Sequence, residues 1–281
     1  MILPYGSEKE LLDTSLDTAL ALEDKVYSQE LIFHAYWTGE LSEQHLISVT
    51  TCWYFNIKGR KNRKIVLWIQ NCPDNVWKEK ISEFVELREY DYEVEVVGTP
   101  FENKEFYAID RPAYFSDVIR YNLLYKYGGL WFDLDNFFLR NLDPVLANFS
   151  DKPFLYRWSD QNYPNGAVYY SPASENSEIE KIIHIFLEKN IGFGFNETKV
   201  GFDTEVDLTV LPCAWFDPAW IENEIINDFS QFFYRNKKNY DLSSFFKGAF
   251  VYHWHNRWNF PIKKGSIISD LYEEVLVLKE K

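Results

Sequence analysis

The sequence predicts an α/β fold with a central, mostly parallel β-sheet that is flanked by helices. The first observation is that segments rich in branched and aromatic residues alternate with helical segments, which is typical of βαβ crossovers and parallel sheets. The second is size, because 281 residues, of which 46% are hydrophobic and 26% charged, can bury a full core. No stretch rich in proline, glycine or serine divides the sequence, so we expect a single domain over residues 1–281.

The first hundred residues show the clearest alternation of strands and helices. Ser42 suits the N-cap of the first long helix, and the basic residues 58–64 suit a loop before the next strand. After a helical lead-in over residues 1–28, strands are predicted at 31–37, 65–70 and 92–97, and helices at 42–56 and 75–87.

A helix, a glycine turn and a buried strand are predicted over residues 110–139. Asp110 suits the helix N-cap and Pro112 suits its first turn. Gly128 suits the left-handed stop that separates this helix from the strand at 130–139.

Two aspartates lie in this otherwise apolar strand. Period-two alternation places Asp133 and Asp135 on one face of it, together with Trp131. Carboxylates in so apolar a run are costly unless a cation neutralises them, so the spacing indicates a site for a divalent metal ion. Because ligands bind at the carboxyl ends of parallel strands, we expect this site to share a cleft with the turn after Trp37.

The pattern is less regular beyond residue 144. The polar, glycine-rich residues 192–207 predict a binding loop, and residues 210–220 form an irregular aromatic segment. Strands are predicted at 154–158, 167–170 and 250–258, and helices at 178–189 and 270–279.

The composition argues against some partners and favours others. A net charge of −14 argues against nucleic acids, whose backbones require a basic face. The 10 Trp, 19 Tyr and 23 Phe residues fit a protein that stacks sugars on aromatic rings. Three cysteines without metal-binding spacing favour a reducing compartment, and the sequence shows neither a signal-peptide pattern nor an apolar run of ~20 residues. We therefore expect a cytoplasmic protein without a transmembrane segment.

Residues 115–139, FSDVIRYNLLYKYGGLWFDLDNFFL, resemble the DXD-containing sugar-transfer family of GT-A glycosyltransferases, which is related to α-1,4-galactosyl- and α-1,6-mannosyltransferase-like enzymes. The family pattern is S-D-x-x-R-Y-x-x-L-Y-x-x-G-G-x-Y-x-D-x-D, and Trp131 replaces its last tyrosine. Fixed spacing over so many positions is far more specific than a bare DXD. The residues in register are Ser116, Asp117, Arg120, Tyr121, Leu124, Tyr125, Gly128, Gly129, Asp133 and Asp135.

Four shorter segments extend the resemblance to residues 30–258. The family often carries a G-P-x-x-L-T loop, but the nearest string here is GFDTE at 201–205, which leaves the acceptor contacts open. The four segments are HAYW at 34–37, NGAVYYSP at 165–172, VLPCAWFDP at 210–218 and VYHWHN at 251–256.

The resemblance implies a single GT-A domain, which is a Rossmann-like nucleotide-sugar-binding fold. Residues 29–145 would form its nucleotide-sugar-binding half, and residues 146–281 an acceptor-side half with the C-terminal histidine element. The implied activity is metal-dependent transfer of a hexose from a nucleotide sugar to a saccharide or glycan acceptor, with retention of configuration. A UDP-sugar is the first expected donor and GDP-mannose the second. The expected cofactor is Mn²⁺ or Mg²⁺, and the expected pathway is surface-glycan or polysaccharide biosynthesis.

The resemblance also assigns roles to individual residues. Asp133, Asp135 and the terminal His253 would bind the metal, with His255 as the second choice for the histidine ligand. The implied catalytic set consists of Asp117, Arg120, Asp133 and Asp135. The implied donor-binding residues are His34, Ala35, Tyr36, Trp37, Tyr114, Asp117, Arg120, Asp133, Leu134, Asp135, Asn165 and Gly166.

Several alternatives stay open at this point. Asp117 and Arg120 have the spacing of an ordinary i,i+3 ion pair on a helix, and His253 could be a structural histidine. The whole chain could be a non-catalytic carbohydrate-binding protein on the same scaffold. A D-x-D phosphatase is disfavoured because Phe137 occupies the Thr or Val position of that motif. Without a G-x-G-x-x-G or Walker lysine motif, a dinucleotide or P-loop site is disfavoured as well.

Retention of configuration requires either a carboxylate nucleophile or front-face attack on the donor. Asp160, Asp203 and Glu205 lie in candidate loops, and the sequence does not rank them. No nucleophile is assigned.

Overall fold

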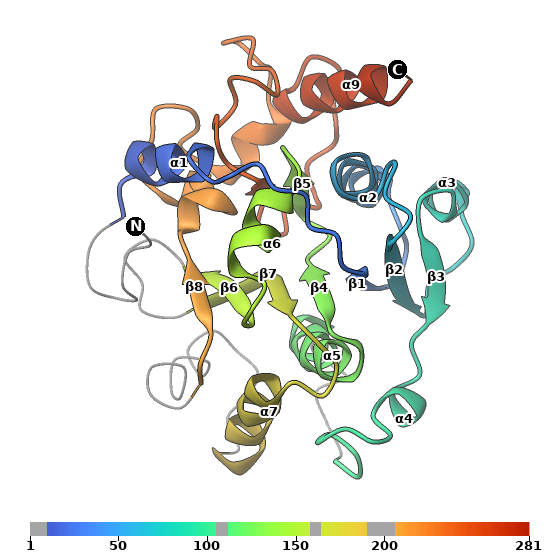
Figure 1. Cartoon of the computed structure of the whole chain (residues 1–281). Helices are drawn as coiled ribbons and strands as arrows, with labels where there is room; N and C mark the ends of the chain where they lie inside the picture. The colour runs from blue at the N-terminus through green and yellow to red at the C-terminus, as the bar shows by residue number, and fades with distance from the viewer. Residues whose placement is uncertain (1–9, 105–111, 158–163, 190–205, 281) are drawn as a thin grey trace.

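The computed structural model describes residues 10–104, 112–157, 164–189 and 206–280 (Figure 1). Several predicted features lie outside the described residues: the start of the lead-in (1–9), the Asp110 cap, the end of the strand at residue 158, and the loop from 192 to 205. The candidate residues Asp160, Asp203 and Glu205 lie outside them as well. Among the described helices, none combines the length and the apolar character that a bilayer span requires.

A mixed, mostly parallel sheet of seven strands forms the centre of the molecule, in the order β3-β2-β1-β4-β7-β6-β8. The first four strands of this order run parallel to one another, β7 runs antiparallel to both β4 and β6, and β8 is parallel to β6. The α/β prediction is confirmed. The strands are β1 (Leu31–Thr38), β2 (Arg63–Gln70), β3 (Glu86–Glu89), β4 (Gly129–Phe132), β6 (Phe154–Arg157), β7 (Pro164–Ser171) and β8 (Thr209–Leu211).

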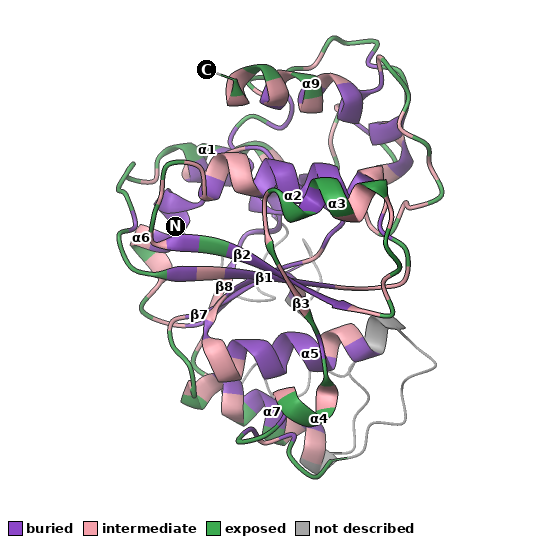
Figure 2. Cartoon of the chain, turned by 90° about the vertical axis from the view of Figure 1, so that its right-hand side faces the viewer, coloured by how far each residue is buried: buried purple, intermediate pink, exposed green. Residues whose placement is uncertain are grey.

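Helices cover both faces of this sheet, as Figure 2 shows. Alternate residues of each strand face the two layers, so Ile65 and Leu67 join one hydrophobic core while Val66 and Trp68 join the other. One layer contains α1 (Leu12–Leu20), α2 (Glu43–Asn56), α3 (Val76–Ser82) and α9 (Ile267–Lys279). The other layer contains α4 (Tyr92–Glu95), α5 (Pro112–Tyr127) and α7 (Ser177–Lys189).

Two short strands form a separate antiparallel pair beyond the carboxyl end of β4. These are β5 (Asn136–Phe138) and β9 (Val251–His253), and Asn136 lies opposite His253. The predicted continuous strand 130–139 is therefore wrong, because a turn that contains the DXD motif separates β4 from β5. The N–H of Asp133 donates to the carbonyl of Ala167, and the N–H of Asn136 donates back to the carbonyl of Asp133.

The predicted strand at 250–258 is also too long. It ends at His253, and His255 and Asn256 take left-handed backbone conformations with φ of 51° and 55°. These two residues turn the chain across the end of β5 instead of extending it as a strand.

The edge of the sheet differs from the prediction. Residues 92–97 were predicted as a strand, but Tyr92–Glu95 form α4, with the Asp91 side chain accepting a hydrogen bond from the Glu93 N–H. The predicted helix 75–87 ends at Ser82, and Glu86–Glu89 form the edge strand β3. Val96 is buried, but Val94 and Val97 are exposed, so the alternation in residues 92–97 does not mark one buried face of a strand.

The remaining elements follow the prediction with shifted ends. The helix predicted at 270–279 begins at Ile267, because the Ser266 side chain caps it by accepting from the Ser269 N–H. The irregular segment 210–220 contains part of β8 and two short 3₁₀ helices, Cys213–Trp215 and Pro218–Trp220. A further helix, α6 (Asp143–Phe149), and a 3₁₀ helix, Phe229–Phe233, complete the described elements.

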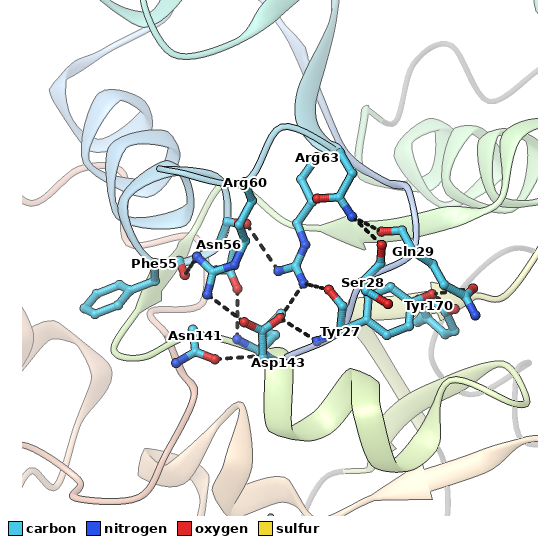
Figure 3. A network of polar contacts seen from close by, with 12 residues as sticks. Tyr27, Ser28, Gln29, Phe55, Asn56, Arg60, Arg63, Asn141, Asp143 and Tyr170 are labelled. Atoms are coloured by element: carbon cyan, nitrogen blue, oxygen red, sulfur yellow. Dashed lines mark hydrogen bonds and ion pairs between the residues drawn. The ribbon is translucent and has the colours of Figure 1, made fainter. Parts of the chain in front are cut away.

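At the amino end of the sheet, a polar network connects three elements (Figure 3). The carboxylate of Asp143, the first residue of α6, pairs with Arg63 at the start of β2 and lies 2.6 Å from Nη2 of Arg60. It also accepts from the Tyr27 N–H, and the Asn56 side chain accepts from the N–H of the residue before Asp143. This network holds the beginning of β2 and the end of α2 against α6.

Candidate active site

Two glycines set the geometry between α5 and β4. Gly128 and Gly129 both have left-handed backbone conformations, with φ of 65° and 92°. A Cβ at Gly128 would lie 2.7 Å from a backbone carbon of Ala173, and a Cβ at Gly129 would overlap the carbonyl oxygen of Ile32. Only glycine fits both positions, and the sharp turn brings residues of α5 beside the end of β4.

Arg120 links two carboxylates at this end of the sheet. Its Nη1 lies 2.9 Å from Asp117 on the same helix, and its Nη2 lies 2.9 Å from Asp133 in the DXD turn. The Trp131 indole N–H donates a second hydrogen bond to the same Asp133 oxygen at 2.6 Å. Burial raises the pKa of Asp117 to about 7, against the opposing charge of Arg120. The predicted pair is thus part of a larger cluster rather than an isolated surface ion pair.

Gly166 of β7 lies against this cluster, and Asn165 precedes it in the strand. A Cβ at Gly166 would overlap the guanidinium of Arg120. Because glycine has no Cβ, the guanidinium can occupy this space. The buried Asn165 side chain accepts from the Ala167 N–H at 2.7 Å, which fixes the local backbone. The structure therefore brings these two predicted residues beside the predicted catalytic residues.

Asp135 is buried and faces the C-terminal part of the chain. Its Oδ2 lies 3.1 Å from Nε2 of His253 and accepts from the N–H of Asn256 at 2.7 Å. Burial acts to raise the pKa of Asp135, but the charge and hydrogen bond of His253, together with the Asn256 N–H and the charge of His255, outweigh this effect and lower that pKa to about 2. Burial likewise acts to lower the pKa of His253, and the paired Asp135 raises it above its ordinary range instead.

The two DXD aspartates and His253 could hold one metal ion. Each offers one ligand atom, and these atoms all lie within 4.8 Å of one another. The Asp133 side chain is 27% exposed, so the group is open to a ligand on one side. Two carboxylates with one imidazole suit a divalent ion such as Mn²⁺, and a site with so few protein ligands leaves positions for substrate oxygens.

One buried carboxylate of the site was missed by the sequence reasoning. Asp217 is fully buried, its Oδ2 lies 2.9 Å from Nε2 of His255, and the His253 ring stacks on His255 at 4.0 Å. These three residues form a second group whose ligand atoms lie within 4.8 Å of one another. The sequence feature that could have indicated this residue is the single aspartate in the aromatic segment 210–220. A carboxylate buried in such a segment requires a hydrogen-bonding or charged partner.

The predicted donor residues of β1 occupy two kinds of position. His34 is buried, where its Nδ1 accepts from the Trp68 indole and its Nε2 contacts the Gly128 carbonyl, each at 3.1 Å. Burial lowers the pKa of His34 to about 3, so the ring is neutral and is engaged on both sides by the fold. Ala35 and Tyr36 are buried as well.

Trp37 lies at the carboxyl end of β1 and is partly buried. Its ring contacts those of His45 and Trp258, with centroids 4.0 and 5.0 Å away. Leu134, the middle residue of the DXD turn, is buried, and the side chain of Tyr114 lies outside the described residues. Donor contacts of these residues stay predictions.

Comparison with known proteins gives a family match for part of the chain. Residues 52–150 match the family model described as "Glycosyltransferase sugar-binding region containing DXD motif". Inositol phosphoceramide mannosyltransferase 3 of Schizosaccharomyces pombe is 29% identical over 153 residues, which cover 50% of this chain and 37% of that protein. The chain thus spans little more than a third of the length of this curated relative.

Solved structures show a similar fold. The apo form of the glycosyltransferase GlyE of Streptococcus pneumoniae TIGR4 superimposes with a TM-score of 0.50 at 11% identity, over 90% of this chain and 63% of that one. Mouse xyloside xylosyltransferase 1 in its apo form gives a TM-score of 0.47 at 13% identity, over 83% of this chain and 100% of that one. The first of these likenesses supports a shared fold.

Proposed function

Residues 52–150 belong to the glycosyltransferase family whose sugar-binding region contains a DXD motif, and from this premise we propose that the chain transfers a hexose from a nucleotide sugar to a saccharide or glycan acceptor. The observation that carries the proposal is the cluster of Asp133, Asp135 and His253 at the carboxyl end of β4, with Arg120 and Asp117 beside it. In α/β sheets, this end of the strands is where ligands bind.

A divalent metal ion fits the donor set of this cluster, and Mn²⁺ or Mg²⁺ is the proposed cofactor. Asp133, Asp135 and His253 would hold it. When bound, such an ion neutralises charge on the leaving diphosphate. Asp133 is kept in place by hydrogen bonds from Arg120 and Trp131, and Asp135 by the Asn256 N–H, so both carboxylates are oriented before any ligand arrives.

Asp117 and Arg120 are proposed to bind the donor sugar. Arg120 pairs through Nη1 with Asp117 and through Nη2 with Asp133. These two contacts fix the position of its guanidinium in the site. Asp117 has a pKa raised to about 7 by burial, so it can act as a hydrogen-bond donor or acceptor toward sugar hydroxyls near neutral pH. Gly166, which packs beside Arg120, and its chain neighbour Asn165 would line the same region.

The donor, the stereochemistry and the setting are further parts of the proposal. A UDP-hexose is the first candidate donor and GDP-mannose the second, and the name of the fission-yeast relative, a mannosyltransferase, supports testing both. We propose retention of configuration and a role in surface-glycan or polysaccharide biosynthesis. The three cysteines, Cys52, Cys72 and Cys213, lack the spacing of a metal site, and we extend the proposal to a reducing compartment such as the cytoplasm.

The experiment that tests this proposal measures release of UDP or GDP from a panel of nucleotide sugars, with Mn²⁺ or with EDTA. The same panel is screened by thermal shift. We expect one nucleotide class to stabilise the protein and to be released from its sugar only when Mn²⁺ is present. Asp135→Asn serves as the matched variant, because it keeps the size of the side chain and removes its charge.

Two outcomes would contradict the proposal. Equal release of nucleotide in EDTA and in Mn²⁺ would exclude metal dependence. Binding of free saccharides without any effect of nucleotide or metal would support a carbohydrate-binding protein instead.

A further inference from the structure

The two ring nitrogens of His253 have different surroundings. Nε2 faces Asp135 at 3.1 Å, on the side of the predicted metal ligands. Nδ1 faces the Tyr156 hydroxyl at 3.2 Å, with Asp217 Oδ2 behind it at 3.6 Å. The distance from Nδ1 to Asp217 is too long for a direct hydrogen bond, whereas the Tyr156 hydroxyl lies 3.4 Å from Asp217 Oδ2 and can connect the two.

Asp217 is itself held firmly. Its backbone N–H donates to the Cys213 carbonyl at 2.7 Å, and its own carbonyl accepts from the Trp220 N–H at 3.1 Å. Its two carboxylate oxygens lie 3.0 and 2.9 Å from Nε2 of His255. A fully buried carboxylate with these contacts has little freedom to move, so it can fix the orientation of the His253 ring.

We propose that Asp217 is a positioning residue that acts through the Tyr156 hydroxyl to keep the His253 proton on Nδ1, so that Nε2 presents its lone pair to a divalent cation. The chain of donors runs from His253 Nδ1–H to the Tyr156 oxygen, and from the Tyr156 O–H to Asp217. Metal-binding histidines commonly have such an outer carboxylate, which fixes the tautomer and the ring orientation. The inference rests on the proposed function, since it assumes a metal ion at Asp133, Asp135 and His253.

The alternative is that Asp217 is itself a ligand of a second ion, together with His253 and His255. That ion would need the lone pair of His253 Nδ1. A neutral imidazole has one lone pair, so it cannot serve an ion at Nε2 and another at Nδ1 at the same time. His255 then has a different role from the one predicted as second choice, because its Nε2 is directed to Asp217 and anchors that carboxylate.

The test compares Mn²⁺ affinity and stoichiometry, by calorimetry, in the wild type and three variants of the full chain. Asp217→Asn removes the buried charge, and Tyr156→Phe removes the connecting hydroxyl while leaving Asp217 in place. Asp228→Asn is the matched control, because this exposed aspartate caps a 3₁₀ helix and asparagine caps equally well. Thermal unfolding in EDTA checks that each variant is folded.

We expect one ion per chain in the wild type, a dissociation constant about 10–100-fold weaker in Asp217→Asn, and a weakening in the same direction in Tyr156→Phe. Asp228→Asn should match the wild type. Nitrogen-15 spectra of the histidines with Mg²⁺ should place the His253 proton on Nδ1 in the wild type, and this signal should be lost or mixed in Tyr156→Phe. A purely structural role for Asp217 would not change the tautomer.

Two results would overturn the inference while leaving the proposed function intact. One is Mn²⁺ affinity within twofold of the wild type in both Asp217→Asn and Tyr156→Phe. The other is two ions per wild-type chain and one in Asp217→Asn, which would make Asp217 a ligand. If the wild type bound no ion at all, the metal-dependent function would fail first and the inference would fall with it.

Discussion

Two largely buried charged clusters lie at opposite ends of the same sheet, and their balance of charge differs. At the amino end, the single carboxylate of Asp143 is surrounded by Arg60 and Arg63 (Figure 3). At the carboxyl end, the described carboxylates are Asp117, Asp133, Asp135 and Asp217, and the cationic or potentially cationic groups beside them are Arg120, His253 and His255.

This difference in charge bears on the role that each cluster can have. The Asp143 cluster satisfies its carboxylate with two guanidiniums, so an added cation would find no free ligand there. The DXD cluster has more carboxylates than permanent positive charges, and burying such an excess is costly unless a cation joins it. We interpret the first cluster as a clamp between α2, β2 and α6, and the second as a site that is completed by a divalent ion.

The largest expected effect is on catalysis. Asp135→Asn removes the charge of a proposed metal ligand, and since a bound metal contributes several kcal/mol of transition-state stabilisation, release of nucleotide from the donor should fall by about 10³-fold or more. Circular dichroism should show that the fold is retained. Asp143→Asn is the comparison variant, and its rate should stay within a few-fold of the wild type. Equal loss of activity in both variants would remove the distinction between the clusters.

The second expected effect is a loss of stability, and it is expected for a variant of Asp143 rather than of Asp135. Asp143→Ala leaves Arg63, whose side chain is 0% exposed, without its ion-pair partner. Loss of one partner from a buried ion pair costs about 3–5 kcal/mol, so urea unfolding should show a decrease of that size in the free energy of unfolding. Mn²⁺ affinity should be unchanged in whatever fraction remains folded. A decrease below about 1 kcal/mol would show that this cluster is not the clamp that we infer.

A third measurement uses the ion as a probe of both clusters. Mn²⁺ at a hundred times its dissociation constant should add about 2.7 kcal/mol to the free energy of unfolding of the wild type. Asp143→Asn should gain the same increment from its lower baseline. Asp135→Asn should gain nothing, and an equal gain in that variant would place the ion elsewhere.

A smaller effect is expected from the glycine that makes room for Arg120. In Gly166→Ala, the new methyl group overlaps the guanidinium, which must then leave Asp117 or Asp133. We expect nucleotide release to fall about tenfold, which corresponds to about 1.4 kcal/mol, and the free energy of unfolding to fall by about 1–3 kcal/mol because the added methyl group overpacks a buried ion pair. Unchanged activity would show that the contacts of Arg120 with these carboxylates do not contribute to the reaction.

The smallest expected effect is on how the free energy of unfolding depends on pH in acid. Burial acts to raise the pKa of Asp143, but hydrogen bonds from Arg63 and Arg60 lower it below its ordinary value of 3.8. A carboxylate with a lowered pKa in the folded state contributes stability that is present above pH 3.8 and is lost as the pH falls through the folded-state pKa. Between pH 5 and pH 3, the wild type should therefore lose more free energy of unfolding than Asp143→Asn, and parallel profiles would contradict this.

The sequence predicted those parts of the site that depend on neighbours in the chain. The helix that carries Asp117 and Arg120, the glycine turn and the DXD pair all lie within one short segment, so their spacing limits how they can be arranged. The central strands β1 and β2 were equally clear, because their residues are apolar on both faces of a covered sheet.

The parts that were missed depend on contacts between distant segments. Asp217 meets His255 because its segment lies against the start of β9, where the Phe250 N–H donates to the Trp215 carbonyl, and no local pattern encodes that contact. The hydrogen bond from Asn256 to Asp135 comes from a backbone N–H in a left-handed turn, which has no side-chain signature. At the sheet edge, the prediction extended a helix over the residues that form the strand β3 and placed a strand over the residues that form the helix α4. Short exposed segments of this kind have little hydrophobic periodicity.

The central claim is that one divalent ion binds between Asp133, Asp135 and His253, and anomalous diffraction from Mn²⁺-soaked crystals tests it most directly. We predict a single strong anomalous peak within bonding distance of these three side chains, which disappears in Asp135→Asn crystals. No peak at this position in well-diffracting wild-type crystals, or a peak only between Asp217 and His255, would contradict the claim.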